Sequence, residues 1–316
     1  MEQLVARSPY YILSLDGGGS LGVYTLGVLV EIERMLSRPL HKAFDLVYGT
    51  STGSIIASMI ALGDKVEGVI DKRYFEIAPD VMGRFSAWGK SAALHRHAKA
   101  VYGDKTFEDF LIDIGIVATH LEYNRPMVFK RKVAQLHGSK NSFQPGFGVS
   151  IADAVIASCS AYPLFKQKII ETPNHGKRIV VDGGFTANSP ALFALTDAIG
   201  LLDVPRENIR MLSIGTGSYP EKWRFMRKMF GTMSPTKTIM TLLRTSSNTV
   251  ETFRKLLFDD VTTIRIDDAF TDSRYKTDFV ESDPNMMKSV YQLGRQSFGK
   301  VERDLHAFFK PGDCLN

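Results

Sequence analysis

The sequence contains only two cysteines, Cys159 and Cys314, and neither lies among other metal-ligating residues. Two isolated cysteines exclude a disulfide framework and agree with a reducing compartment. The sequence also lacks the roughly 18 uninterrupted apolar residues that a membrane-spanning helix needs, and its first residues have no secretory pattern. We therefore expect a cytoplasmic protein that uses no metal or other cofactor.

Linkers and repeats are equally scarce. No change of composition divides the 316 residues, and no segment repeats another. A hydrophobic fraction of 44% with 23% charged residues is typical of a folded, enzyme-sized domain. We expect a single domain over residues 1–316. The net charge of +5 weakly favours anionic partners, either a membrane surface or nucleic acid.

The first 60 residues contain two strands that each run into glycines. Residues 10–15 are a β-prone apolar run that ends in Asp16-Gly-Gly-Gly19, and residues 21–36 then have the pattern of a buried helix. Residues 44–48 lead in the same way into Gly49-Thr-Ser-Thr-Gly53 and a helix to about residue 62. Two such units predict an α/β fold with a mostly parallel central sheet.

The rest of the chain continues this pattern with one interruption. Residues 64–122 mix aromatic and basic residues, so we expect a helical insertion or lid there. Further strands are predicted at 126–133, 177–181, 209–214 and 262–266, and helices at 151–160, 190–202, 236–258 and 285–309. Residues 218–316 are expected to complete the domain with helices, so that helices sandwich the sheet.

Three polar corners flanked by glycine fall at predicted strand ends: Asp16 to Gly19, Gly49 to Gly53, and Asp182 to Gly184. Ligands of open α/β sheets bind at the carboxyl ends of the strands, so these corners can form one site. Ser51, on the tight turn, would be the nucleophile and Asp182 the base. The backbone amides of Gly17, Gly18 and Gly19 would bind the oxyanion. The competing interpretation is that the glycines only permit turns.

Histidine is absent from these corners. A Ser-His-Asp triad in the α/β-hydrolase order needs a histidine on a loop late in the chain. The histidines after Ser51 do not occupy strand ends with glycine neighbours; they are His95, His97, His120, His137, His175 and His306. We therefore expect Asp182 to accept the proton of Ser51 directly.

The segments Asp16-Gly-Gly-Gly-Ser-Leu-Gly22, Gly49-Thr-Ser-Thr-Gly53 and Asp182-Gly-Gly184 resemble the three motifs of patatin-like phospholipases, in the family's order. Residues 157–165 resemble the family's Ala-Ser-x-Ala-x-Pro segment, and the whole resemblance covers about residues 10–217. It implies a patatin-like fold and a phospholipase A-type lipid acyl hydrolase, which cleaves membrane phospholipids through a Ser-Asp dyad and an acyl-serine intermediate.

The resemblance also bears on partners. A lipid acyl hydrolase would associate peripherally with phospholipid at the inner membrane face, and no nucleic-acid polymer is expected. Bacterial members of the family include antiviral effectors that cyclic nucleotides switch on. A cyclic-nucleotide activator is therefore compatible with the resemblance.

One residue departs from the family's pattern. The glycine motif of the family usually ends in Gly-x-Arg-Gly, whereas this chain has Ser20-Leu21-Gly22. Leu21 removes a cation that could hold an anionic substrate group or organise the glycine loop. One alternative is therefore a catalytically weak or inactive patatin-like protein that binds lipid or acts as a scaffold. Another is a nucleotide-binding module with a phosphate loop at 16–19, but the Gly-Lys-Ser/Thr ending of such loops is missing.

Residues 222–233 have the pattern of an interfacial helix. At helical spacing one face is apolar and another is basic, and the residues expected to contact a membrane are Trp223, Arg224, Arg227 and Phe230. A surface helix that docks its apolar stripe on the domain would have the same pattern. The sequence leaves both alternatives open.

Overall fold

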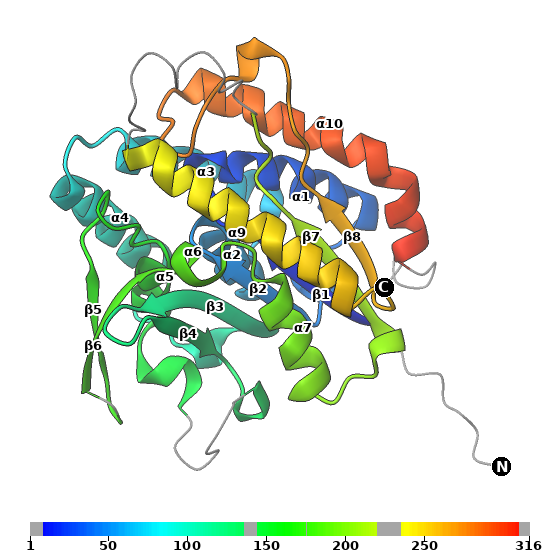
Figure 1. Cartoon of the computed structure of the whole chain (residues 1–316), viewed down its shortest axis with the longest axis horizontal. Helices are drawn as coiled ribbons and strands as arrows, with labels where there is room; N and C mark the ends of the chain where they lie inside the picture. Colours follow the sequence, from blue (N-terminus) through cyan, green and yellow to red (C-terminus); the bar gives the residue numbers. More distant parts are fainter. Residues whose placement is uncertain (1–8, 136–143, 175, 220–234, 310–316) are drawn as a thin grey trace.

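The computed structural model describes residues 9–135, 144–174, 176–219 and 235–309 (Figure 1). Within these ranges, eight strands form one sheet in the order β5-β6-β3-β2-β1-β7-β8, and β4 pairs with β3 off this path. The strands are β1 (Tyr10–Leu15), β2 (Leu46–Thr50), β3 (Asp113–His120), β4 (Arg125–Lys130), β5 (Lys168–Thr172), β6 (Gly176–Asp182), β7 (Ile209–Ile214) and β8 (Thr262–Ile266).

The sheet is parallel at its centre and antiparallel at one flank. Strands β3, β2, β1, β7 and β8 run parallel to one another. Strands β4 and β6 pair antiparallel with β3, and β5 pairs antiparallel with β6. The predicted parallel sheet is confirmed for the central strands, and the antiparallel flank is an addition to it.

Helices cover both faces of the sheet. They are α1 (Gly22–Leu36), α2 (Thr52–Ala61), α3 (Asp71–Met82), α4 (Ala87–Tyr102), α5 (Ile151–Ser158), α6 (Gly184–Ala187), α7 (Ala191–Gly200), α9 (Pro235–Leu257) and α10 (Pro284–Phe308). Helices α1 and α10 lie side by side on one face (Figure 1), where α2, α3, α4 and α5 share their hydrophobic cluster, and α7 and α9 cover the other face. Over the described ranges, no helix is both long and apolar enough to cross a bilayer.

Successive side chains of the central strands pack into hydrophobic clusters on opposite faces of the sheet, because side chains alternate along a strand. Leu13 and Leu15 of β1 join the cluster beneath α1 and α2, whereas Ile12 packs with Tyr48 and the alanines of α7. All four of these side chains are fully buried. Burial on both faces is typical of parallel strands covered by helices and accounts for their unbroken apolar runs.

A buried polar network joins β4 to α7 on the face of the sheet that α7 and α9 cover. Lys130 Nζ donates hydrogen bonds to Asp197 Oδ1 at 2.6 Å and to the carbonyl of Gln135 at 2.9 Å. The hydroxyl of Tyr48 donates to Asp197 Oδ2. Burial raises the pKa of the Tyr48 hydroxyl, and the Asp197 carboxylate raises it further, so Tyr48 remains a donor. The Asp197 charge is therefore balanced inside the core.

The expected insertion at residues 64–122 is only partly helical. Helices α3 and α4 occupy its first part, but Asp113–His120 form β3, which pairs with β2 and β6 inside the sheet. All eight residues of β3 are buried. The strand escaped prediction because Gly115, Thr119 and His120 interrupt its apolar run. The excursion from the sheet therefore ends before residue 113.

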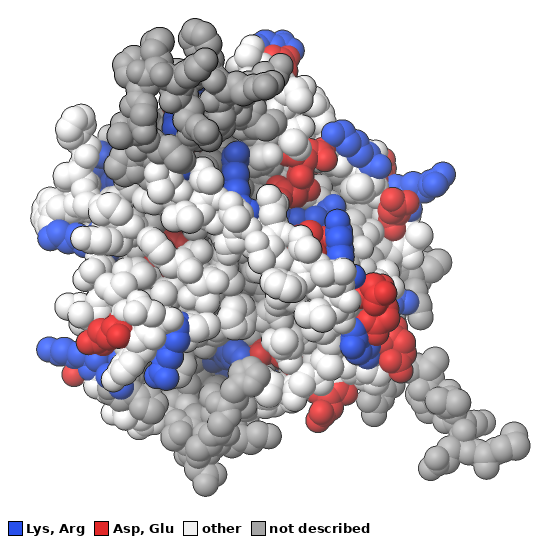
Figure 2. Space-filling view, viewed as in Figure 1, with Lys and Arg blue, Asp and Glu red and all other residues white. Residues whose placement is uncertain are grey.

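Charged groups are dispersed on the face that carries α7 and α9. Figure 2 shows Lys, Arg, Asp and Glu side chains around a broad area without charge. Helix α9 contributes exposed apolar side chains, including Leu242 and Phe253. On this face, the positive net charge of the chain is therefore not gathered into one basic stripe.

Candidate active site

The site is built around the turn that links β2 to α2. Ser51 has φ 51° and ψ −124°, a backbone conformation that is uncommon for a residue with a Cβ. Two glycines allow the chain to pack this closely. A Cβ on Gly49 would lie 2.4 Å from the carbonyl oxygen of Gly53, and a Cβ on Gly53 would lie 2.2 Å from that of Leu15. The strand-to-helix elbow predicted from the sequence is present.

Ser51 and Asp182 meet beside this elbow. Ser51 Oγ donates a hydrogen bond to Asp182 Oδ2 at 2.7 Å, and Asp182 Oδ1 accepts the backbone amide of Gly184 at 2.7 Å. Strand β6 brings Asp182 to the edge from the opposite direction, since it runs antiparallel to β3 with Asp182 opposite Ala118. Asp182 therefore lies at the end of its strand and at the shared edge, as expected, although β6 is not one of the parallel strands.

The environment of Asp182 makes its carboxylate a stronger base. The side chain is 3% exposed. Burial raises the pKa of Asp182 from 3.8 to about 6, while the hydrogen bonds from the Gly184 amide and the Ser51 hydroxyl oppose the rise. A carboxylate with this pKa is still largely ionised at pH 7 and can accept a proton from Ser51. Of the described residues that line the cavity around Ser51, none is a histidine.

The glycine loop at residues 16–19 lies beside Ser51 but does not offer all three expected amides. Gly17 N donates to the carbonyl of Asn188 at 3.0 Å, so this amide is already engaged within the fold. No backbone carbonyl of the described chain accepts the amides of Gly18 and Gly19, and both residues line the Ser51 cavity. The expected oxyanion donors therefore narrow from three glycines to Gly18 and Gly19.

Contacts from distant parts of the chain fix the glycine loop. Arg265 on β8 forms a bidentate ion pair with Asp16, with Nη1–Oδ1 at 3.0 Å and Nη2–Oδ2 at 2.6 Å. The carbonyl of Gly19 accepts the Tyr74 hydroxyl at 2.6 Å and Thr52 Oγ1 at 2.8 Å. Bidentate pairs fix orientation as well as distance. Sequence reasoning missed Arg265 and Tyr74, because neither lies in a motif.

A small apolar cavity, the catalytic cavity, lies beside Ser51. Its volume is about 50 Å³, and its walls are mainly aliphatic and aromatic side chains, including Ile55, Ile77, Leu243 and Phe279. Pockets that hold small-molecule ligands measure roughly 300–1,000 Å³. In the described conformation the catalytic cavity is therefore too small to enclose a fatty acyl chain.

Two further sequence expectations concern Leu21 and the interfacial helix. Leu21 is 5% exposed and packs in the main hydrophobic cluster, so it serves the core at the start of α1. The candidate membrane contacts Trp223, Arg224, Arg227 and Phe230 lie outside the described residues. Across the described ranges, no group of three or more His, Cys, Asp and Glu side chains is arranged to hold a metal ion.

The arrangement defines a class of enzyme. A serine on a strand-to-helix elbow, hydrogen-bonded to a buried carboxylate and flanked by glycine amides that no described backbone carbonyl accepts, is the arrangement of a serine hydrolase that works with a Ser-Asp pair. The model of the patatin-like phospholipase family matches residues 13–195, which contain the elbow, Asp182 and the glycine loop. The chain belongs to the patatin-like phospholipase family.

Known proteins resemble the chain to different extents. A cUMP-AMP-activated phospholipase of Escherichia coli is 48% identical over 302 residues, covering 94% of this chain and 93% of that protein. A cGAMP-activated phospholipase of Escherichia coli strain TW11681 is 28% identical over 233 residues, covering 65% of this chain and 61% of that protein. The crystal structure of VipD from Legionella pneumophila matches with a TM-score of 0.45 and 14% identity, covering 95% of this chain and 67% of that one.

Proposed function

We propose that the protein is a phospholipase A-type lipid acyl hydrolase, with Ser51 as nucleophile and Asp182 as base. The observation that carries the proposal is the 2.7 Å hydrogen bond from Ser51 Oγ to a buried carboxylate whose pKa is raised to about 6. Membership of the family supports acyl hydrolysis. The apolar lining of the catalytic cavity favours a fatty acyl chain over a polar substrate.

The reaction follows from these positions. Asp182 Oδ2 takes the proton as Ser51 Oγ attacks the ester carbonyl, and the amides of Gly18 and Gly19 stabilise the oxyanion. Loss of one such donor costs about 2.7–4 kcal/mol in other serine hydrolases. The protonated carboxyl then gives its proton to the departing lysolipid alcohol, which leaves an acyl-serine. Water, activated by the same carboxylate, releases the fatty acid.

A lipid digest of phospholipid vesicles tests the chemistry. The native protein should release fatty acid, whereas Ser51→Ala should release none and should no longer react with a fluorophosphonate probe. Ser289→Ala, on α10, is the matched control and should behave as the native protein. A native protein that leaves both vesicles and probe unreacted, with or without nucleotide, would instead be the inactive lipid-binding or scaffold protein.

Regulation by a cyclic nucleotide is part of the proposal. The names of two relatives state activation by cUMP-AMP and by cGAMP, and the first aligns along almost the whole chain. The small volume of the catalytic cavity agrees with an enzyme that must open before lipid enters. We propose that a cyclic dinucleotide triggers this opening in antiviral defence. Equal rates of vesicle hydrolysis with and without cUMP-AMP and cGAMP would contradict this part.

Peripheral membrane contact is proposed at the turn between α3 and α4. Phe85 is fully exposed and Trp88 is 67% exposed, while Val81 and Met82 just before them line the catalytic cavity. Exposed aromatic side chains are favoured at the membrane interface. In a liposome flotation assay, Phe85→Ser combined with Trp88→Ser should weaken binding, and Leu257→Ser at the far end of α9 should not. Unchanged flotation of the double variant would argue against this contact.

A further inference from the structure

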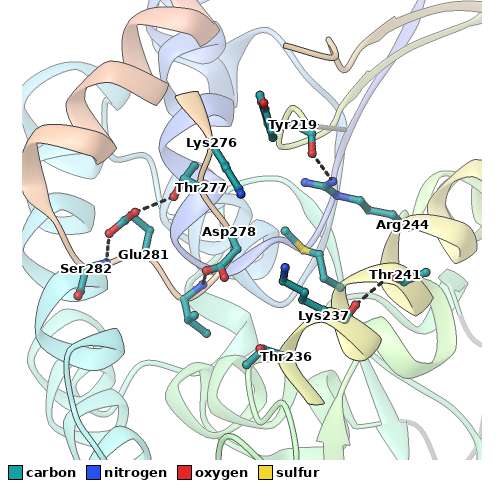
Figure 3. Close-up of a pocket in the computed structure, with 12 residues that line it drawn as sticks. Tyr219, Thr236, Lys237, Thr241, Arg244, Lys276, Thr277, Asp278, Glu281 and Ser282 are labelled. Atoms are coloured by element: carbon teal, nitrogen blue, oxygen red, sulfur yellow. Dashed lines mark hydrogen bonds between the residues drawn. The ribbon is translucent and has the colours of Figure 1, made fainter. Parts of the chain in front are cut away.

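A second and much larger cavity, which we call the basic cavity, lies between the start of α9 and the segment 276–282 (Figure 3). Its volume is about 480 Å³, within the roughly 300–1,000 Å³ of pockets that bind small molecules. It is lined by Tyr219, by Lys237, Met240 and Arg244 from α9, and by Lys276 and Thr277 from the segment. The basic cavity thus has room for a dinucleotide, which the catalytic cavity lacks.

The charges around the basic cavity suit an anion with more than one negative charge. Lys237 and Arg244 extend from α9 and Lys276 extends from the opposite side, so that three cationic groups reach toward the same space (Figure 3). Cationic groups on both sides of one cavity can pair with a ligand that carries two negative charges.

The two acids of the segment, Asp278 and Glu281, also line the basic cavity and accept hydrogen bonds from neutral donors within or next to the segment. Asp278 Oδ1 accepts the amide of Val280 at 3.0 Å. Glu281 accepts the Thr277 hydroxyl at 2.7 Å and the amides of Ser282 and Asp283 at 2.8 Å. These carboxylates therefore hold the shape of segment 276–282, and the three cationic side chains still outnumber the two carboxylates in the lining of the basic cavity.

Segment 276–282 is also a wall of the catalytic cavity. The carbonyl of Phe279 accepts the amide of Ser20 at 2.9 Å, directly after the glycine loop, and the Phe279 side chain lines the catalytic cavity. The contact is close, since a Cβ on Gly19 would lie 2.2 Å from the Phe279 carbonyl oxygen. Helix α9 is shared in the same way: Leu243 lines the catalytic cavity, and Arg244, the next residue, lines the basic one.

We propose that the basic cavity is the binding site for the activating cyclic dinucleotide, and that bound nucleotide draws segment 276–282 and Phe279 away from the catalytic cavity. The inference rests on the proposed regulation by a cyclic nucleotide, and adds where the nucleotide binds and how it opens the catalytic cavity. A cyclic dinucleotide carries two phosphodiester charges, which pair with the lysines and Arg244. The Tyr219 ring offers a surface on which a base can stack.

Titration calorimetry with cUMP-AMP tests whether the nucleotide binds in the basic cavity. Lys237→Ala combined with Lys276→Ala should weaken binding about 100-fold, since each lost charge-assisted hydrogen bond is worth roughly a factor of ten. The charge-matched control, Lys99→Ala combined with Lys177→Ala, lies on α4 and β6 and should bind as the native protein does. Nucleotide-free fluorophosphonate labelling of Ser51 should be the same in all three proteins. Native affinity in the Lys237/Lys276 variant would overturn the assignment.

The outcomes separate this site from the proposed function. If the native protein hydrolyses vesicles but binds no cUMP-AMP or cGAMP, the proposed regulation fails, and this site fails with it. If the native protein binds nucleotide and the double variant binds it equally well, only the site is wrong. Glycerophosphoglycerol is a second probe, because a lipid headgroup is also a phosphodiester. Binding of this probe in place of the nucleotide would overturn the assignment in favour of a substrate headgroup.

The coupling to the catalytic cavity needs a variant of its own. Phe279→Leu shortens the side chain by which segment 276–282 lines the catalytic cavity, while keeping it apolar. It should raise nucleotide-free fluorophosphonate labelling of Ser51 at least several-fold and leave the affinity for cUMP-AMP within about twofold of native. A thermal melt confirms that the variant is folded. Labelling that stays at the native level, with normal nucleotide binding, would overturn the opening mechanism.

Discussion

Burial of the Asp182 carboxyl group has one effect on catalysis and another on stability, and replacing Asp182 with asparagine should separate them. The substitution keeps the size of the side chain and an oxygen that can accept the Gly184 amide, which now bonds Asp182 Oδ1 at 2.7 Å. It removes the proton acceptor of Ser51 and also removes a charge from a site that is 3% exposed. We expect Asp182→Asn to abolish hydrolysis and, at the same time, to raise the free energy of unfolding at pH 7.

The magnitude follows from the pKa of Asp182. Burial raises this pKa from 3.8 to about 6, and each pKa unit corresponds to 1.36 kcal/mol, so the gain is roughly 3 kcal/mol. The folded state binds the proton more tightly than the unfolded state does. The contribution of this carboxyl to stability is therefore most favourable below pH 3.8 and is lost as the pH rises through about 6. The native protein bears the whole penalty at pH 7 and above.

Urea unfolding between pH 5 and pH 8 measures this effect. The difference in the free energy of unfolding, Asp182→Asn minus native, should be positive at pH 7 and should shrink toward pH 5. Ser51→Ala is the matched control: it is equally inactive but keeps the carboxyl, so its stability should still fall as the pH rises, with the fall shifted to a higher pH because the Ser51 hydrogen bond that lowers the pKa of Asp182 is lost. An Asp182→Asn protein that is less stable than native at pH 7, or whose difference from native is the same at every pH, would refute the reasoning.

Three further predictions concern pH, the buried network and the start of α1. The value of kcat should fall about tenfold per pH unit below about 6, because Asp182 must be ionised to act as base in the lipid-bound enzyme; rates of hydrolysis at saturating lipid, measured over a series of pH values, would show this limb. Lys130→Met should lower the free energy of unfolding, measured in urea, by about 3–5 kcal/mol, because it leaves the fully buried Asp197 carboxylate without its cation. Adding Asp197→Asn to this variant should restore most of the lost stability. Leu21→Arg should lower the melting temperature without increasing hydrolysis, since it buries a guanidinium in the core, whereas Leu21→Met should cost less than about 1.5 kcal/mol.

The central strands were predictable because both of their faces are buried, so that their residues form unbroken apolar runs in the sequence. The bounds of β1, β7 and β8 agree with the expected 10–15, 209–214 and 262–266. Strand β3 was missed because small and polar residues interrupt it, and β5 because it is a short strand of a hairpin at the end of the sheet. The antiparallel direction of β6 could not be predicted from the sequence either. Pairing of β6 with β3 joins residues at least 60 positions apart, and no local sequence pattern predicts it.

The residues that perform chemistry and those that position them differ in how far the sequence reveals them. Ser51 and Asp182 lie beside glycines, and the spacing of those glycines indicates tight turns at strand ends. Arg265 lies 249 residues from Asp16, and its role depends on where β8 docks. Gly17 shows the converse, because its place in a glycine run predicted a free amide, and only the fold reveals that Asn188 accepts it. Motifs therefore locate the reacting groups, and tertiary contacts decide which backbone amides remain available.

Among the described residues no histidine lines the catalytic cavity, and the cavity itself offers a physical explanation. An aspartate exposed to water, with a pKa near 3.8, is too weak a base to take a proton from a serine hydroxyl efficiently. The apolar walls around Ser51 remove that water and raise the pKa of Asp182 toward the working pH. When the cavity opens, water would lower this pKa again, whereas a fatty acyl chain in the cavity keeps the carboxyl desolvated. Substrate binding and base strength are therefore linked: the acyl chain that fills the cavity also preserves the base that cleaves its ester.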